Sequence, residues 1–144
     1  MLNTSKQVFR WSGFTNRTNH AGHLIAIGEL AGTDDITLPG LTLQIEIKAP
    51  VDVSRCLMLF SIMQLESRVR RPIYQLEVAP AEKRTHNGLE PIFGPHEHVG
   101  GNAPVAVANP DVSCTNWHAT LRWFFTRTSV TPFSISDPRS YVEL

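Results

Sequence analysis

The stretch from residue 41 to residue 48 has the clearest pattern in the chain, because apolar and polar residues alternate along it. The apolar set is Leu41, Leu43, Ile45 and Ile47, and the polar set is Thr42, Gln44, Glu46 and Lys48. Alternation with a period of two indicates a β-strand that has one buried face and one solvated face. Pro39-Gly40 and Ala49-Pro50 flank the stretch and are typical strand breakers. We therefore predict a strand over residues 41–48.

Three further segments predict strands, at residues 7–14, 22–30 and 72–78. An interior glycine, Gly28, indicates a bulge in the second of these strands. The segment 56–65 is apolar on both faces, so its periodicity fits either a buried central strand or a buried helix. We favour a strand because predicted strands lie before and after it, although Asp52 or Ser54 could cap a helix instead.

The best helix candidate lies near the C-terminal end, where Trp117, Leu121, Phe124 and Phe125 fall at helical spacing after a potential N-cap at Thr115. The alternative is an aromatic strand over residues 120–130, since these residue types also favour strands. The sequence from about residue 132 is expected to be irregular. Together these elements predict one α+β domain over residues 1–144, with a mainly antiparallel sheet of about five or six strands and one C-terminal helix.

Composition narrows the class of protein. With 42% hydrophobic and 18% charged residues, the chain is expected to fold as a globular domain. The 13 Lys and Arg residues balance 13 Asp and Glu residues, which argues against strong non-specific binding to DNA. No apolar run is long enough to span a membrane, and the N-terminal region lacks a signal-like apolar segment. We therefore expect a cytoplasmic protein without a membrane partner, in which Cys56 and Cys114 are reduced thiols.

The segment from His86 to His98 holds half of the six histidines. If Pro95 opens a strand, His96 and His98 project to the same face and Glu97 projects to the other. Two imidazoles on one face can bind a divalent metal ion, or act as an acid and a base near neutral pH. The plain alternative is a solvated loop that happens to carry two histidines.

His86 is a candidate for a third functional group beside His96 and His98. As metal ligands, these three histidines would hold zinc or another divalent transition metal with a position left open for water. Without a metal, they would be catalytic residues that cleave a phosphate ester such as RNA. Either version predicts a hydrolase or nuclease-like enzyme.

Two other groups of residues could contribute to such a site. Arg68, Arg70 and Arg71 form a basic cluster that could hold phosphate, since arginine offers a planar set of donors. Cys114 and His118 are four residues apart and would share a helix face if the helix began near residue 113. Joined to His96 and His98, they would complete a less favoured, closed zinc site.

The residues Y-Q-L-E-V-A-P at 74–80, H-N-G at 86–88 and G-P-H-E-H at 94–98 resemble small prokaryotic and prophage domains of unknown function. The resemblance covers about residues 72–128, and the chain lacks the N-P-D-G turn that is typical of those domains. It implies that His86, His96 and His98 are the shared positions. It also implies a bacterial or phage-infected cytoplasm, but it supplies no reaction.

A second class of function needs none of these histidines. A small, neutral domain can act as a protein–protein interaction module that binds a partner through an exposed strand or an aromatic patch. Replacing His96 and His98 distinguishes the two classes, because an interaction module that binds elsewhere would tolerate the change.

Overall fold

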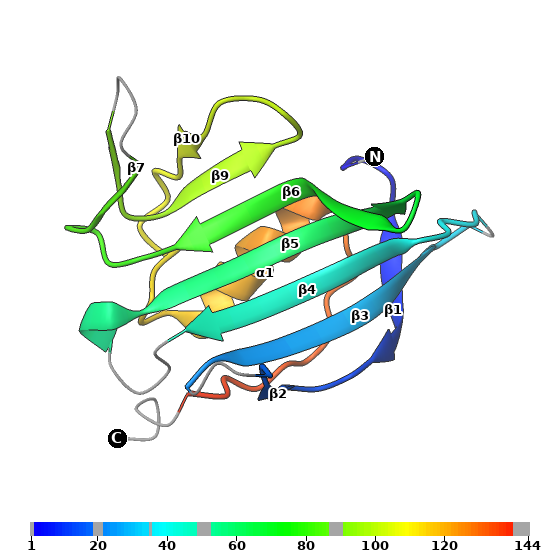
Figure 1. Cartoon of the computed structure of the whole chain (residues 1–144), viewed down its shortest axis with the longest axis horizontal. Coiled ribbons are helices and arrows are strands. Elements are labelled where there is room, and N and C mark those ends of the chain that lie inside the picture. Colours follow the sequence, from blue (N-terminus) through cyan, green and yellow to red (C-terminus); the bar gives the residue numbers. More distant parts are fainter. Residues whose placement is uncertain (1, 19–21, 35, 49–52, 87–90, 140–144) are drawn as a thin grey trace.

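The alternating segment at residues 41–48 forms strand β4 near the middle of an eight-stranded antiparallel sheet in the computed structural model (Figure 1). The structure describes residues 2–18, 22–34, 36–48, 53–86 and 91–139. Across the sheet the strands follow the order β1 (Lys6–Trp11), β3 (Leu24–Gly32), β4 (Leu41–Lys48), β5 (Leu57–Glu66), β6 (Val69–Val78), β9 (His96–Val99) and β10 (Val105–Ala106). The short strand β2 (Thr15–Asn16) also pairs with β3.

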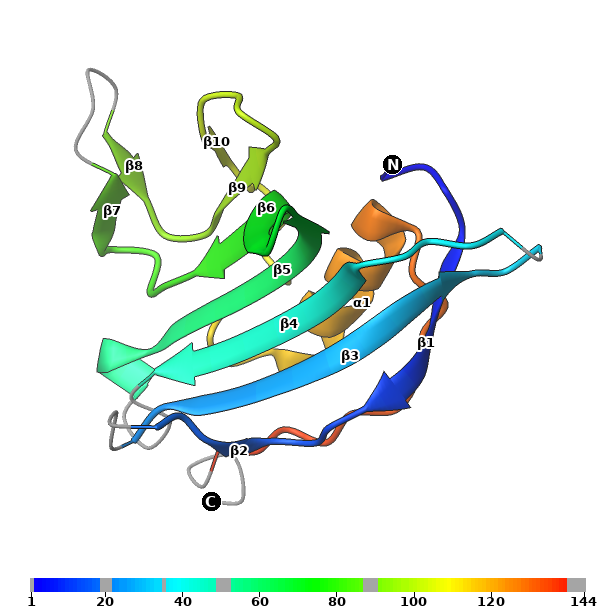
Figure 2. The ribbon, with the colours of Figure 1, turned by 45° about the vertical axis from the view of Figure 1, so that its right-hand side comes forward.

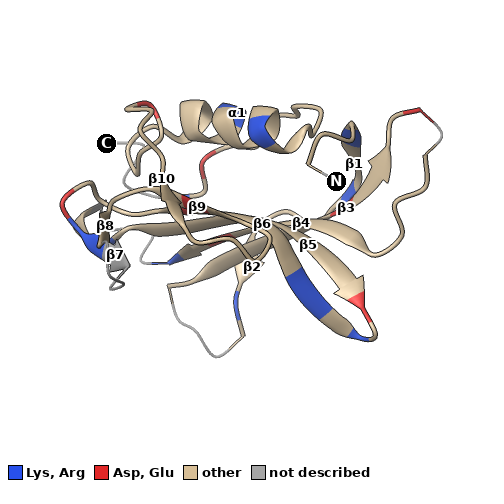
Figure 3. Ribbon diagram, turned by 90° about the horizontal axis from the view of Figure 1, so that it is seen from above, with Lys and Arg blue, Asp and Glu red and all other residues tan. Residues whose placement is uncertain are grey.

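Three smaller elements lie outside this sheet. Strands β7 (Arg84–His86) and β8 (Ile92–Phe93) form a separate hairpin, and η1 (Val53–Arg55) is a short 3-10 turn before β5. The α-helix α1 (Trp117–Thr128) packs on one face of the sheet, as Figure 3 shows in side view. The predicted α+β class, with a mainly antiparallel sheet and one C-terminal helix, is confirmed. No helix in the described ranges is long and apolar enough to cross a membrane.

Apart from Cys56, the segment 56–65, which periodicity could not assign, belongs to strand β5. It pairs along its length with β4 on one side and β6 on the other. Its residues Met58, Phe60 and Ile62 are fully buried on the α1 side of the sheet. Between β5 and β6, Ser67 and Arg68 both have positive φ angles, of 48° and 70°, as a two-residue hairpin turn requires. Strand β6 therefore begins at Val69, earlier than predicted.

Gly28 does not form the bulge that we expected in the second strand. The irregularity lies in the neighbouring strand β1, between Val8 and Arg10. A Cβ atom at Gly28 would lie 3.0 Å from Val8 Cγ1 and 3.1 Å from Trp11 Cε3. The glycine is needed because it lets the side chains of β1 pack directly on the backbone of β3.

Aromatic side chains hold α1 on the sheet. The ring of Phe124 lies 5.4 Å from that of Phe60 and 6.0 Å from that of Tyr74. The helical assignment is therefore correct, and the alternative strand over residues 120–130 is wrong. The N-cap is Asn116 instead of Thr115, since the Asn116 side chain accepts a hydrogen bond from the Ala119 amide.

The segment after α1 is irregular, as predicted, yet Val130, Ile135 and Arg139 in it are buried. The carbonyl of Ile135 accepts a hydrogen bond from Trp117 Nε1 at 2.8 Å. At the start of the segment, Val130 forms a parallel bridge with Lys6 of β1. The Lys6 side chain is completely buried and donates to the carbonyls of Leu2, Thr4 and Thr128. The C-terminal segment thus covers the β1 edge of the sheet.

Cys56 and Cys114 form a disulfide bond, so the prediction of two reduced thiols is wrong for this structure. The bond joins the residue before β5 to the loop before α1. The two Cα atoms lie 6.2 Å apart, a separation that a disulfide spans without moving the backbone. The expectation came from an argument about the cellular compartment, and nothing local in the sequence shows that the fold brings these two residues together.

Candidate functional site

The two histidines of β9 lie on the same face of the sheet, as their spacing predicts. This face is opposite α1, and we call it the open face. Strand β9 pairs with β6 so that His96 lies beside Glu77 and His98 lies beside Gln75. The two imidazole rings are 5.1 Å apart between centroids and meet edge to face. The H-x-H pair is therefore part of a strand and not of a solvated loop.

His96 is held on both of its ring nitrogens. Its Nε2 atom lies 3.3 Å from the carboxylate of Glu77, and its Nδ1 atom lies 3.3 Å from the carbonyl oxygen of Gly94. Both neighbours are acceptors, so only the doubly protonated ring can donate to both of them. The His96 side chain is 2% exposed, whereas His98 is half-buried. His98 is thus the member of the pair that a solute can reach.

Glu97 points to the opposite face and ties β9 to the core. Its carboxylate accepts a hydrogen bond from the Tyr74 hydroxyl at 2.7 Å and lies 3.2 Å from Arg127 Nε in α1. Burial and this hydrogen bond raise the pKa of Tyr74 far above its usual range. The predicted alternation is therefore correct, since Glu97 points away from the two histidines. Its contacts on the core side hold the strand that carries them.

Gly94 sets the turn from β8 into β9. Its φ angle is +74°, and a Cβ atom there would lie 3.0 Å from the Cα atom of Ala81. A side chain is thus excluded both by the backbone conformation and by the neighbouring chain. The turn brings the Gly94 carbonyl to the ring of His96, so the glycine positions the buried histidine directly.

His86 lies in β7, whose backbone pairs with β8. The hairpin of β7 and β8 lies next to β9 and β10 at one corner of the molecule in both Figure 1 and Figure 2. The fold therefore brings this strand to the same corner as His96 and His98. The side chain of His86 and the following residues 87–90 fall outside the described part of the chain, so a third group at His86 stays a prediction.

Polar side chains continue from the histidines across the open face. The pairing of β4, β5, β6 and β9 aligns this face in two cross-strand rows. The first row holds the polar residues Gln44, Ser61, Gln75 and His98. The second row is Glu46, Leu59, Glu77 and His96, in which the apolar Leu59 interrupts the polar residues. In the first row, Gln75 donates to the Ser61 hydroxyl at 3.2 Å. In the second row, Glu46 is buried and forms an ion pair with Arg17.

Glu77 is the residue of this site that the sequence did not reveal. The alternation of Tyr74, Leu76 and Val78 places Glu77 on the other face of its strand, which is a readable signal. However, the contact between Glu77 and His96 depends on the register between β6 and β9. That register depends in turn on the whole connection between the two strands.

The arginine cluster does not join the histidines. Arg68, Arg70 and Arg71 are exposed at the turn end of the β5–β6 hairpin, which projects away from the helix side in Figure 3. Arg71 lies four residues before Gln75, which pairs with His98. An extended strand rises ~3.3 Å per residue, so Arg71 and Gln75 are roughly 13 Å apart along β6. Arg71 Nε lies 3.9 Å from the carboxylate of Glu66. These arginines and the histidines are thus two separate features.

The four-ligand zinc set is also not assembled. Cys114 is bonded to Cys56, so it has no thiolate to offer a metal ion. It also precedes the N-cap of α1, whereas His118 lies exposed in the first turn of that helix. Within the ranges that the structure describes, no three His, Cys, Asp or Glu residues are close enough to hold a metal ion.

Comparisons with models of protein families, with curated proteins and with solved structures find no significant match. The resemblance to prophage domains therefore rests on the residues of the chain alone. Any assignment of function has to come from the geometry of β9 and its neighbours.

Proposed function

We propose that the open face at β9 is an acid–base site in which His98 exchanges a proton with a bound substrate. The observation that supports this proposal is the chain of contacts from Glu77 through His96 to His98. The carboxylate of Glu77 lies 3.3 Å from His96 Nε2, and the His96 ring lies 5.1 Å from the His98 ring. Proton transfer near neutral pH is the chemistry that imidazole side chains perform best.

The three side chains have different roles in this proposal. His98 is the catalytic residue, because it is the histidine that a substrate can touch. His96 is a positioning residue, since it is buried and its nitrogens face Glu77 and Gly94. Glu77 fixes the His96 ring in turn, and its own side chain is 25% exposed at the edge of the site.

The proposed substrate is a phosphate ester, RNA included. RNA carries its own nucleophile, the 2′-hydroxyl group, beside each phosphate. Its cleavage therefore needs a base that accepts the hydroxyl proton and an acid that protonates the leaving oxygen. His98 supplies one of these groups, and His86, on the adjacent hairpin, is the candidate for the other. A divalent metal ion bound by the same histidines is the competing form of this proposal.

The test is cleavage of an RNA oligonucleotide by untagged protein, with and without a chelator, together with elemental analysis of the same protein. We expect His98→Ala to lower the rate by roughly 10²- to 10⁴-fold, the range for loss of a general acid or base. His118→Ala is the matched control, because this exposed histidine lies on α1, and it should keep full activity. Wild-type activity that His98→Ala leaves unchanged would refute the site. A stoichiometric metal that is lost in His98→Ala would favour the metal form.

A second candidate function, the interaction module, is favoured by a different part of the surface. A pocket of about 540 Å³ lies between β1 and the connection from β3 to β4. Its walls include Phe9 and Ile36, which are 57% and 48% exposed. Exposed apolar side chains that line one pocket together can form a binding surface for a partner protein. A cellular assay of the protein's activity distinguishes the two functions. If the protein is an interaction module, the double variant Phe9→Ser, Ile36→Ser should abolish this activity. If it is an acid–base enzyme, His98→Ala should abolish it.

A further inference from the structure

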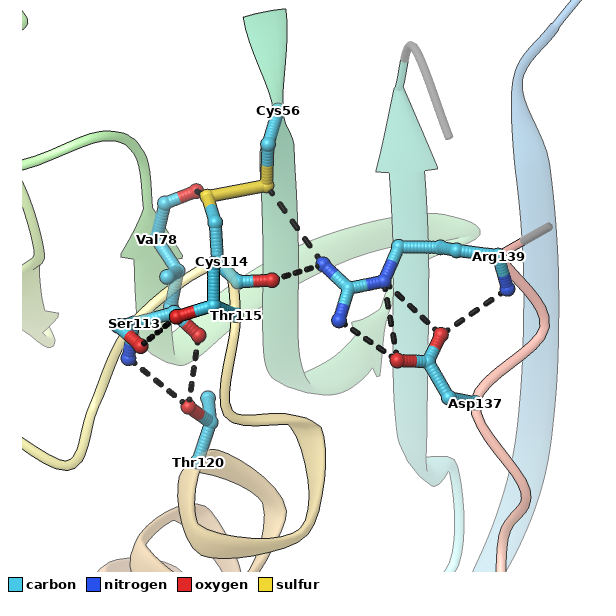
Figure 4. The surroundings of a disulfide bond; sticks show 8 residues. All are labelled: Cys56, Val78, Ser113, Cys114, Thr115, Thr120, Asp137 and Arg139. Carbon is cyan, nitrogen blue, oxygen red and sulfur yellow. Dashed lines mark hydrogen bonds and ion pairs between the residues drawn. A yellow bond between two sulfur atoms is a disulfide. The ribbon is translucent and has the colours of Figure 1, made fainter. Parts of the chain in front are cut away.

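A buried arginine lies against the disulfide bond. Figure 4 shows Arg139 approaching the bridge from the Cys56 side, with its Nη1 atom 3.9 Å from Cys56 Sγ. The same nitrogen donates to the carbonyl of Cys114. Arg139 is only 1% exposed, so its charge acts in a region that solvent screens weakly.

The position of this charge is fixed by its neighbours. Asp137 accepts from Arg139 Nη2 at 2.6 Å and from Nε at 2.9 Å, and the guanidinium lies 5.8 Å from the ring centroid of Trp117. A neutral disulfide sulfur gains little from a nearby cation. A thiolate at Cys56, in contrast, would gain a charge-assisted contact, because nearby positive charge is what stabilises thiolates in proteins.

The other cysteine forms part of the wall of a pocket. This pocket has a volume of about 610 Å³ and lies between the end of β6, the β7–β8 hairpin and the loop before α1. Most of its lining is apolar and includes Ala79, Pro80, Phe93, Pro95, Val107 and Val112, with Cys114 among the lining residues. In Figure 4, the lining residues Ser113 and Thr115 lie on the Cys114 side of the bridge, away from Arg139.

We infer that the Cys56–Cys114 bond is a reactive disulfide that accepts electrons from a dithiol bound in this pocket. One thiolate of the dithiol attacks Cys114 Sγ and forms a mixed disulfide. The bond between the two cysteines breaks, and its electron pair leaves on Cys56 Sγ as a thiolate beside Arg139. This order follows from the placement of the two cysteines, because Cys114 lines the pocket whereas the cation lies at Cys56.

The second thiol of the dithiol completes the exchange. It loses its proton, attacks the sulfur of the first and closes a new disulfide within the reagent. Cys114 leaves as a thiolate and takes up that proton. The dithiol is thereby oxidised by two electrons and the protein bridge is reduced by two. The apolar lining of the pocket favours a dithiol carried on an apolar chain. This activity is independent of the histidine site and does not require it.

The test measures reduction of the native bridge by dithiothreitol and by dihydrolipoamide, with the thiols trapped by alkylation and counted by mass spectrometry. Two variants should act in opposite directions. Arg139→Gln removes the cation, so we expect reduction to slow at least tenfold and the equilibrium in a glutathione buffer to move towards the disulfide. Asp137→Asn leaves the cation without its counter-charge, so we expect faster reduction and an equilibrium displaced towards the thiols. Arg122→Gln, at an exposed site on α1, is the control and should change neither.

A further variant tests access through the pocket without changing Arg139 or Asp137. The test therefore does not depend on the folding of the two charge variants. Ala108→Trp places a large side chain at an exposed residue that lines the pocket and should slow the reaction with dihydrolipoamide. The inference is overturned if the two charge variants, folded by circular dichroism, shift the equilibrium in the same direction or not at all. It is also overturned if wild-type protein is reduced only at the rate of global unfolding, measured across a urea series.

Discussion

The guanidinium of Arg127, in the last turn of α1, lies 3.2 Å from the carboxylate of Glu97, the residue between the two histidines of β9. Because Glu97 also accepts from the Tyr74 hydroxyl, one carboxylate joins α1, β6 and β9 on the core side of the sheet. The position of the histidines on the open face therefore depends on contacts made on the far side of the same strand.

We expect Glu97→Gln to lower both stability and activity. The amide keeps the size of the side chain but loses the charge, and a hydrogen bond to a charged group contributes about 1.5–3 kcal/mol. The free energy of unfolding, measured in urea, should fall by an amount of this order. The activity of the unchanged His98 should fall as well, because β9 is held less firmly. Arg122→Gln serves as the control, and a Glu97→Gln protein of unaltered stability would contradict the prediction.

The stability of the protein should pass through a maximum in alkaline solution. Burial lowers the pKa of Lys6 from 10.5 to about 8. Between these values the unfolded chain holds a proton that the folded chain has lost, so stability rises with pH, by at most ~1.4 kcal/mol per pH unit. The pKa of Tyr74 is raised above its ordinary value of 10.0, so above that pH the unfolded chain loses a proton that the folded chain keeps, and stability falls.

Urea denaturation at a series of pH values from 7 to about 11 measures this profile. Lys6→Met should remove the rising part of the curve, and Tyr74→Phe should remove the falling part. A profile that both substitutions leave unchanged would show that neither group controls the alkaline stability.

Gly94→Ala should disturb the histidine site. An alanine with positive φ costs about 1–2 kcal/mol, and the added Cβ atom would also lie 3.0 Å from Ala81 Cα. Gly100→Ala is the matched control, because Gly100 also has a positive φ but no atom lies within 4 Å of its added Cβ. The difference in unfolding free energy between the two variants isolates the clash. NMR shifts of the His96 and His98 rings should change in Gly94→Ala and not in Gly100→Ala.

Loss of the disulfide should lower stability by about 4 kcal/mol. The bond closes a loop between residues separated by 58 positions, and the chain-entropy relation gives this magnitude for a loop of that size. Urea denaturation of the Cys56→Ala, Cys114→Ala double variant measures the loss, and reduced wild-type protein should behave in the same way. If the double variant is as stable as the oxidised wild-type protein, this prediction is wrong.

The elements with a strong local pattern were predictable from the sequence. Strict alternation located β4, and aromatic residues at helical spacing located α1 in spite of their preference for strands. Segment 56–65 could not be assigned from its own residues, because the open face of β5 also carries apolar side chains such as Leu59. It is a strand because it forms hydrogen bonds with β4 on one side and with β6 on the other.

Only part of the candidate site could be predicted from the sequence. The shared face of His96 and His98 follows from spacing within one strand, whereas the contact of His96 with Glu77 depends on pairing between two strands. Arg139 had no signal at all, since it lies in an irregular segment and its partners come from distant parts of the chain. Long-range contacts of this kind have no periodicity to read.

The contact between Lys6 and Thr128 also determines when the fold can be completed. The two residues are separated by 122 positions, whereas β3, β4, β5 and β6 pair with their immediate neighbours in the chain. During synthesis the central strands can pair early, but β1 cannot bury its lysine until α1 has been translated. Contacts between such distant residues also slow folding. The Lys6 side chain therefore stays in solvent until the residues up to Thr128 have been translated, so β1 takes its final place later than the central strands.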